Sequence, residues 1–192
     1  MIHYDHPILG LDIDGVLADF VTAYIDAFIT HTGKNLFPPR PFPWTDWEHQ
    51  ELCGYTPADS ELVWSKLNDS TDFWEQLNAY SDIDHTIRLA NHFPTYFITS
   101  RNGHNVKGQT ERWLSRHGVL HPTVLISSHK GLCCKALGIT HYVDDRTENC
   151  ESVVADSPTT ACTMIAQPWN RQIPNVPRLP LAVWTSYIDR YR

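Results

Sequence analysis

Short apolar runs alternate with helically spaced apolar residues along much of the chain. The pattern predicts helices over residues 83–92, 106–117 and 131–137, and strands over residues 95–98, 123–126, 141–143 and 161–166. We expect the strand over 161–166 to be the last one. The apolar run Ile8–Leu11 is typical of one more buried strand, because polar residues and Gly15 soon follow it. Strands that alternate with helices in this way are typical of a parallel sheet.

The stretch after the first predicted strand follows a helical pattern instead. Apolar residues recur at helical spacing over Phe20–Thr32, and Gly33 then marks a helix end. A second helix is expected over Pro57–Leu67, because Thr56 precedes a proline and is followed three residues later by an acid. A further short helix is expected over residues 72–77.

A proline-rich passage, Phe37–Trp44, lies between these helices. Prolines exclude a regular helix or a central strand there. Because aromatic residues are interleaved with the prolines and need burial, we expect an ordered loop. Residues 20–85 together are therefore predicted to form a small helical insertion.

Composition limits the classes of function. The chain has 192 residues, of which 42% are hydrophobic, enough for one compact domain with a small insertion. Its net charge of −7 argues against extensive, salt-dependent electrostatic binding of nucleic acid, but it allows a small anionic substrate. Five cysteines without a CxxC pair favour reduced thiols and a cytoplasmic location. No signal peptide and no apolar run of about 18 residues are found, so no membrane association is expected.

Two aspartates, Asp12 and Asp14, directly follow the first predicted strand. Side chains two residues apart on a strand point the same way, so we expect the two carboxylates to lie together. Two such charges about 4 Å apart repel each other by roughly 4 kcal/mol at an effective dielectric constant of 20. The pair persists if it shares a proton or binds a cation. The alternative interpretation is an ordinary solvated acidic turn.

Three other predicted strands also end in polar residues, namely Thr99 and Ser100, Lys130, and Asp144 and Asp145. Each group alone has an ordinary explanation: a helix N-cap, a surface lysine or an acidic turn. In an open parallel sheet, however, ligands bind at the carboxyl ends of the strands. The four strand ends together therefore predict one site.

These residues resemble the motifs of the haloacid dehalogenase-like phosphohydrolases, in particular the 5′(3′)-deoxyribonucleotidase branch. The matching segments are Asp12–Phe20, Phe97–Ser100, Lys130 and Val143–Arg146, in family order. The branch is indicated by Ala18–Phe20, by the chain length and by Gln167–Asn170. The resemblance implies an α/β fold. Its core would be a Rossmann-like parallel sheet made of residues 1–19 and 86–192, and residues 20–85 would form the cap.

The resemblance also implies roles for the strand-end residues. Asp12 would be the nucleophile that forms an aspartyl phosphate, and Asp14 the general acid and then the base. Mg²⁺ would be held by Asp12, the backbone carbonyl of Asp14, one aspartate of the Asp144–Asp145 pair and the phosphate. The sequence leaves open which of the two aspartates is the direct ligand, and Asp145 is slightly favoured.

The phosphoryl oxygens would be bound by Thr99, Ser100 and Lys130. Lys135 is a rival for the role of the lysine, but it falls inside a predicted helix.

The candidates for contact with the rest of the substrate are Phe20, Phe73, Trp74, Arg101 and Arg146. The three aromatic residues would stack on a nucleobase or a sugar; the alternative is that they build a small core. The two arginines would reach phosphate or substrate; the alternative is that they are ion-paired neighbours of the motifs. The residue at position 101 departs from the animal nucleotidases, in which we expect a proline.

The sequence thus predicts a Mg²⁺-dependent phosphatase that hydrolyses nucleoside monophosphates through an aspartyl-phosphate intermediate. A phosphatase for another small metabolite or for nucleic-acid 3′ ends is the enzymatic alternative, and the acidic charge disfavours the nucleic-acid version. A binding protein without activity is the third hypothesis, which the complete set of motif residues disfavours. The expected partner is a small phosphomonoester, and a homodimer is left open.

Overall fold

The computed structural model describes residues 6–39, 52–81, 83–170 and 178–192. The strands are β1 (Leu9–Leu11), β2 (Thr95–Thr99), β3 (Val124–Ile126), β4 (His141–Asp144), β5 (Ala161–Ile165) and β6 (Arg178–Leu179). The α-helices are α1 (Phe20–Thr32), α3 (Pro57–Asp69), α4 (Ile83–His92), α5 (Val106–Arg116), α6 (Lys130–Leu137), α7 (Thr147–Asp156) and α8 (Leu181–Ile188). Short 3₁₀ helices cover Phe73–Glu75, Pro168–Asn170 and Asp189–Tyr191. Most of the predicted proline-rich loop, from Arg40 onward, lies outside the described residues.

The strands form one parallel sheet in the order β3-β2-β1-β4-β5-β6. The central strand β1 pairs with β2 on one side and with β4 on the other. The chain reverses its direction of travel across the sheet at this point, where α/β proteins of this topology bind their ligands. The predicted α/β fold with a Rossmann-like parallel sheet is confirmed.

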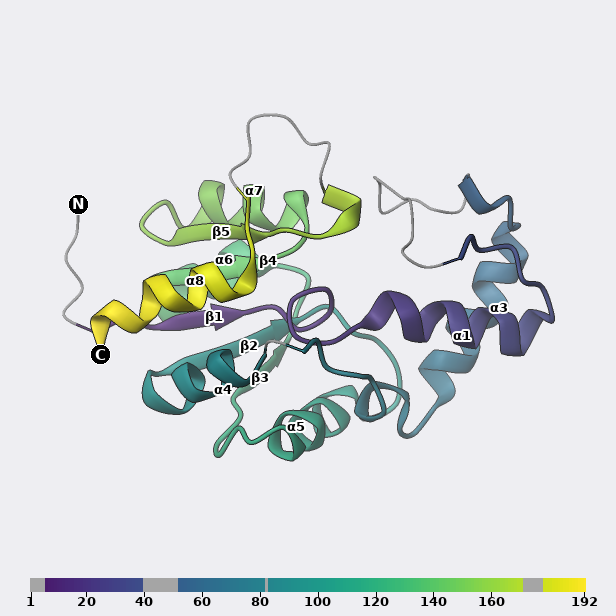
Figure 1. Ribbon diagram of the computed structural model, residues 1–192, viewed down its shortest axis with the longest axis horizontal. Helices are drawn as coiled ribbons and strands as arrows, with labels where there is room; N and C mark the ends of the chain where they lie inside the picture. Colours follow the sequence, from purple (N-terminus) through teal and green to yellow (C-terminus); the bar gives the residue numbers. More distant parts are fainter. Residues whose placement is uncertain (1–5, 40–51, 82, 171–177) are drawn as a thin grey trace.

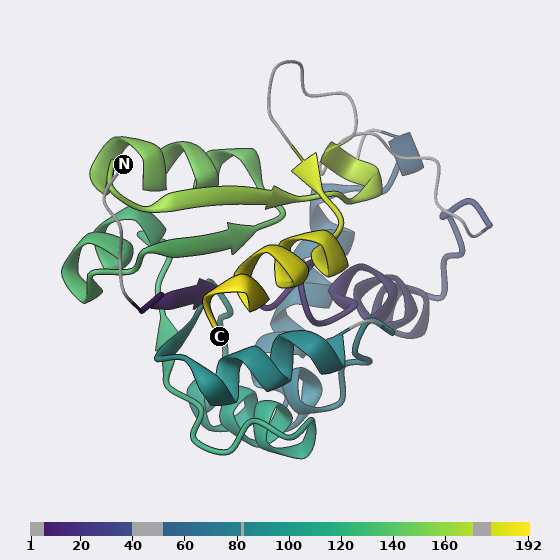
Figure 2. The same ribbon diagram turned by 60° about the vertical axis from the view of Figure 1, so that its left-hand side comes forward.

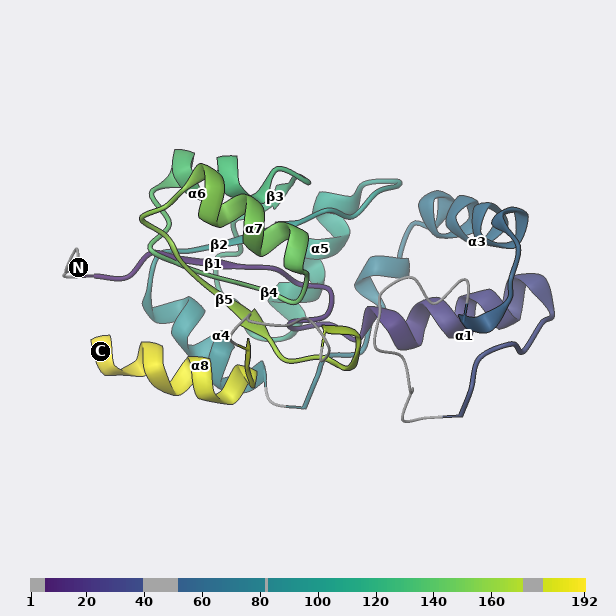
Figure 3. The same cartoon turned by 90° about the horizontal axis from the view of Figure 1, so that it is seen from above.

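Helices cover both faces of the sheet (Figure 1). Figures 2 and 3 show α6 and α7 on one face, and α4 and α8 on the other. Trp113 and Trp184 are fully buried in the larger cluster, whereas Tyr142 and Ile98 are buried under α6 and α7. Because both faces are covered, the strands are nearly all apolar, and polar side chains gather at their ends.

Helices α1 and α3 belong to the segment that we expect to form the cap, which we call the cap below, and they lie beyond the carboxyl ends of the strands (Figure 1). Helix α1 begins after Asp19, whose side chain accepts a hydrogen bond from the Thr22 amide, and ends at Gly33 in the left-handed conformation. Helix α3 begins with the capping box that Thr56 and Asp59 form. The predicted ends of α1 and the predicted start of α3 are thus confirmed.

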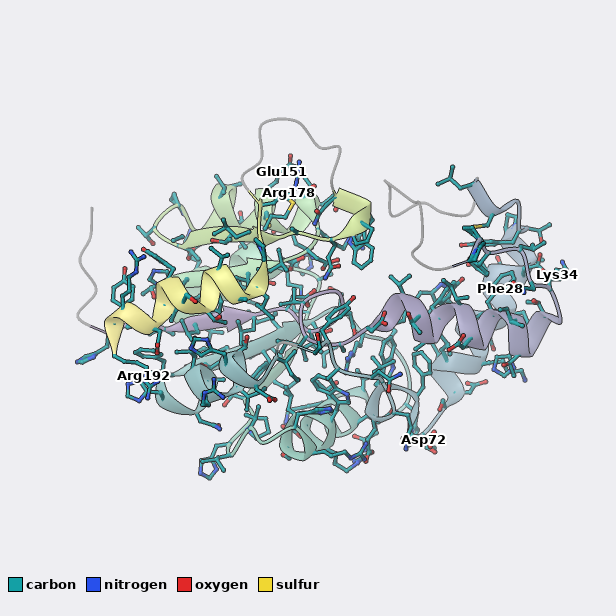
Figure 4. All side chains as sticks on the ribbon, viewed as in Figure 1. Phe28, Lys34, Asp72, Glu151, Arg178 and Arg192 are labelled. Carbon is teal, nitrogen blue, oxygen red and sulfur yellow. The ribbon has the colours of Figure 1, made fainter. Side chains whose placement is uncertain are left out.

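Aromatic residues continue the larger hydrophobic cluster to the end of the cap far from the sheet, where Figure 4 places Phe28 and Lys34. Phe28 packs against Tyr55 with ring centroids 4.9 Å apart. Where the chain enters and leaves the cap, its two segments are hydrogen-bonded together: the Asp19 amide donates to the Asn78 carbonyl (2.8 Å) and the Tyr80 amide to the Leu17 carbonyl (2.9 Å).

The structure corrects two predictions about elements. The strand over 161–165 is present, but it is not the last, because β6 follows at Arg178–Leu179 and pairs with it. The segment predicted as a short helix over 72–77 contains only a 3₁₀ turn at Phe73–Glu75. Helices α7 and α8 were not predicted. Only two residues of α7 are buried, Cys150 and Val153, so its sequence carries little helical periodicity.

Candidate active site

A cavity of about 320 Å³ lies between the carboxyl ends of the strands and the cap. Residues from both parts of the chain line it: Asp12, Asp14, Phe20, Trp64, Trp74, Thr99, Ser100, Arg101, Asn102, Ser128, Asp145, Arg146, Glu148 and Asn149. Segments far apart in the sequence therefore converge at one edge of the sheet, as the strand-end residues predicted.

Asp12 and Lys130 form a buried ion pair at the floor of this site. The Lys130 ammonium, whose side chain is 1% exposed, donates to Asp12 Oδ1 over 2.7 Å and also to the Ile98 carbonyl. The Asp12 amide donates to the Val143 carbonyl (3.0 Å), which extends the sheet by one residue and fixes this backbone. Lys135 is exposed on α6, so of the two rival lysines it is Lys130 that contacts Asp12.

Burial perturbs the charges of this pair. It raises the pKa of Asp12 to about 7, although Lys130 acts in the opposite direction. Burial alone would lower the pKa of Lys130, but the charges of Asp12 and Asp144 hold it above its ordinary value. Without a further cation, the site therefore resists full ionisation of its acids.

Asp144 and Asp145 differ in how their oxygens are satisfied. Asp144 accepts hydrogen bonds on both oxygens, from the Tyr142 hydroxyl (2.8 Å), the Arg146 amide (2.9 Å) and the Asn149 amide group (2.9 and 3.1 Å). Asp145 Oδ2 accepts a bond from the Trp169 indole (2.7 Å), whereas Oδ1 is buried and has no hydrogen-bond partner among the described residues. Burial and the charge of Asp144 raise the pKa of Asp145 well above its ordinary value.

These acids form a group that fits a divalent cation. Asp12, Asp144 and Asp145 each offer a carboxylate oxygen within 4.8 Å of the others, and all three are buried. Within the part of the chain that the structure describes, four carboxylates, including Asp14, face two buried cations, Lys130 and Arg101, so ionised acids would leave two negative charges in excess. An all-oxygen donor set of this charge suits Mg²⁺. The unpaired Oδ1 of Asp145 makes it the better direct ligand of the two neighbouring aspartates.

The loop after β5 holds Asp145 and the Gly15 turn in place. Asn170 donates to the Asp145 carbonyl (2.8 Å), and the Gln167 amide donates to the Gly15 carbonyl (2.5 Å). Gly15 has φ +83°, and a Cβ there would collide with the Asp145 carboxylate, so only glycine fits. The segment Gln167–Asn170, noticed in the sequence as a branch marker, thus supports Asp145 through the Trp169 indole.

Asp14 has a cationic partner of its own. Arg101 donates through Nε to Asp14 Oδ2 (2.9 Å) and through Nη2 to Asp14 Oδ1 (2.8 Å), a two-pronged contact. The Thr99 hydroxyl reaches the same carboxylate at 3.4 Å. Asp12 and Asp14 thus lie at one site but have separate cations, a division that sequence spacing did not reveal.

Aromatic side chains form the cap wall of the cavity. Phe20 stacks on Trp74 and on Trp64, with centroids 5.6 and 5.8 Å apart. Trp74 is 2% exposed and Phe20 6%, whereas Trp64 retains more accessible surface. Phe73 packs edge-on against Phe20 and does not line the cavity. Sequence reasoning missed Trp64, although its spacing from Val63 and Leu67 on α3 places it beside the buried residues of that helix.

A family model described as 5′ nucleotidase, deoxy (pyrimidine), cytosolic type C, matches residues 6–188. The chain belongs to this family. It is therefore a phosphatase of the haloacid dehalogenase-like superfamily and a phosphoric monoester hydrolase of the nucleotidase type. No curated protein matches the chain significantly.

Solved structures resemble this nucleotidase-family chain in fold. A haloacid dehalogenase-like family hydrolase from Streptococcus pneumoniae has a TM-score of 0.64 at 15% identity, over 95% of this chain and 98% of that one. A haloacid dehalogenase family hydrolase from Deinococcus radiodurans R1, with bound phosphate and sodium, has a TM-score of 0.53 at 13% identity, over 97% and 89%. The likeness spans nearly the whole chain, cap included. Among the described residues no helix is long and apolar enough to cross a membrane.

Proposed function

We propose that this nucleotidase-family phosphatase hydrolyses nucleoside monophosphates with the help of Mg²⁺, through an aspartyl phosphate on Asp12. The observation that carries the proposal is the buried Asp12 carboxylate at the centre of the sheet edge. It lies beside Lys130 and within 4.8 Å of two further acids, and it lines a cavity with an aromatic wall.

In this reaction an oxygen of Asp12 attacks phosphorus, and the bond from phosphorus to the ester oxygen breaks. Asp14 gives its proton to the departing oxygen, and it later takes one from the water that hydrolyses the aspartyl phosphate. Lys130, Thr99 and Ser100 donate to the phosphoryl oxygens, whose negative charge they oppose. Asp12, the carbonyl of Asp14 and Asp145 would hold Mg²⁺, which neutralises phosphoryl charge when bound.

The cap wall supports a substrate that carries a flat ring. Trp64 has the most accessible surface of the three stacked rings, and we assign it the contact with the base; Phe20 and Trp74 support it from behind. Arg146 and Asn102 line the cavity and offer hydrogen-bond donors to the sugar or the phosphate. A cytoplasmic site of action is part of the proposal, because all five cysteines are free thiols.

The test measures phosphate release from purified protein with nucleoside 5′- and 3′-monophosphates, sugar phosphates and 3′-phosphorylated oligonucleotides, with Mg²⁺ or with EDTA. We expect the highest kcat/KM on a nucleoside monophosphate and no turnover in EDTA. Trp64→Leu, with exposed Leu62→Ala on the same helix as the control, should raise KM for nucleotides only. Preference for a sugar phosphate, or no release from any small phosphomonoester, would refute the proposal.

A further inference from the structure

Arg101 is a completely buried arginine that connects three parts of the site. Its side chain is 0% exposed and donates hydrogen bonds to both oxygens of Asp14. Its third nitrogen, Nη1, donates to the Thr110 hydroxyl of α5 over 3.0 Å. Its guanidinium carbon lies 4.9 Å from the ring centroid of Trp74, in the cap wall of the cavity.

Packing alone does not explain this arrangement. A buried guanidinium loses its hydration, and an apolar side chain of similar volume would fill the space at no such cost. What an arginine adds is a planar fork with fixed geometry that matches a carboxylate. The guanidinium is also held on its far side, by the hydrogen bond to Thr110 and by the ring of Trp74.

The alternative is that Arg101 binds the phosphoryl group itself. Three of its nitrogens already donate to protein groups, two of them to Asp14. Lys130 already brings a donor to Asp12, and Thr99 brings a hydroxyl beside Asp14, so other side chains are available to bind the phosphoryl group. Arg101 is therefore arranged to hold Asp14.

We propose that Arg101 is a positioning residue that fixes the plane of the Asp14 carboxyl group, so that one oxygen faces the leaving-group oxygen of the substrate. The inference rests on the proposed phosphatase reaction. Asp14 Oδ2 accepts from both Arg101 Nε and the Thr99 hydroxyl, whereas Oδ1 accepts one bond from the fork and keeps a lone pair for the substrate. A carboxyl group held in one plane is already oriented to pass its proton to the ester oxygen as the phosphorus–oxygen bond breaks, so no orientational entropy is lost at that step.

Phosphate esters with different leaving groups should respond differently when Asp14 is misoriented. A p-nitrophenolate leaves without needing a proton, whereas the alkoxide of a nucleoside 5′-monophosphate needs the proton of Asp14. The ratio kcat/KM reports only the steps up to departure of the leaving group, so the later hydrolysis of the aspartyl phosphate does not affect it. Misorientation of Asp14 therefore lowers kcat/KM for the nucleotide and spares p-nitrophenyl phosphate.

The experiment compares Arg101→Lys with the wild type on both esters. Lysine keeps the charge but lacks the fork, so we expect kcat/KM to fall about 10- to 100-fold on the nucleotide and to change less than about 2-fold on p-nitrophenyl phosphate. Thr110→Val, which removes the rear anchor of Arg101, should cause a smaller loss with the same selectivity, and it covers the case in which Arg101→Lys does not fold. Matched controls are Arg192→Lys, in an exposed ion pair, and Thr185→Val, in α8.

Equal losses on both esters in folded variants would mean that Arg101 binds phosphate or only supports the fold, and they would overturn the inference. No loss on either ester would overturn it as well. A wild-type protein that cleaves neither ester refutes the proposed function instead, and the inference with it.

Discussion

Asp144 and Asp145 are neighbours in sequence, but replacing each by asparagine should change different properties. Asp145 has one buried oxygen that no described residue contacts by a hydrogen bond, and burial raises its pKa well above its ordinary value. Asp145→Asn therefore removes a proposed metal ligand, together with a carboxyl group whose charged form burial disfavours. Asp144 instead accepts hydrogen bonds from Tyr142, Arg146 and Asn149. Asp144→Asn turns an amide N–H toward one of those donors.

The magnitudes follow from these contacts. Loss of a residue that only supports a ligand lowers metal affinity about 10- to 100-fold, so loss of a ligand itself should cost at least about 100-fold, or about 2.8 kcal/mol. We expect this of Asp145→Asn, with unchanged or increased stability in the absence of metal. Asp144→Asn should lose about 1–3 kcal/mol of unfolding free energy for its broken hydrogen bonds, and about 10-fold in metal affinity.

Two measurements separate the variants. Isothermal titration calorimetry with Mg²⁺, or electron paramagnetic resonance with Mn²⁺ as a probe, gives the dissociation constant. Urea denaturation in EDTA gives the unfolding free energy. The reasoning is refuted if Asp145→Asn binds the metal as the wild type does while Asp144→Asn does not bind it.

Two further predictions concern the Asp12–Lys130 pair. Lys130→Met should lower kcat about 10²- to 10³-fold, because it removes the positive charge that opposes the phosphoryl group. At pH 8 it should also destabilise the fold by up to about 3 kcal/mol, because Asp12 loses its buried partner. A folded Lys130→Met variant with the wild-type kcat would contradict this. The pKa of Asp12, raised from 3.8 to about 7, means that the metal-free fold binds a proton that the unfolded chain releases. Stability in EDTA should therefore fall as pH rises from about 4 to about 7, by at most about 4 kcal/mol from this group, and Asp12→Asn should remove that part of the slope. Identical urea-denaturation pH profiles for the two proteins would count against the buried carboxyl as its source.

Local signals in the sequence were sufficient for most elements. Gly33 and Gly138 adopt the left-handed conformation that ends α1 and α6, and Thr56 caps α3. These signals act within one turn, so they can be read without tertiary structure. Strand β6 has two residues and α7 only two buried ones, so neither carries a periodic pattern long enough to detect.

The sequence predicted which strand ends form the site, but it did not predict which cation pairs with which carboxylate. Parallel topology brings Asp12, Lys130 and Asp145 to one edge whatever the details, and the structure brings them together. Which cation meets which carboxylate depends on tertiary packing. The contact of Arg101 with Asp14 needs Thr110 of α5 behind it, and the bond from Trp169 to Asp145 spans 24 residues. No spacing rule encodes either contact.

The roles assigned to Asp12 and Asp14 can be separated in one trapping experiment. Wild-type protein is mixed with Mg²⁺ and a phosphomonoester that it hydrolyses, the reaction is stopped with acid during turnover, and the phosphorylated residue is located by fragmentation mass spectrometry. The account predicts one phosphoryl group, on Asp12, and no phosphoryl group and no turnover in a folded Asp12→Asn variant. A phosphoryl group on Asp14, or turnover by Asp12→Asn at the wild-type rate, would contradict it.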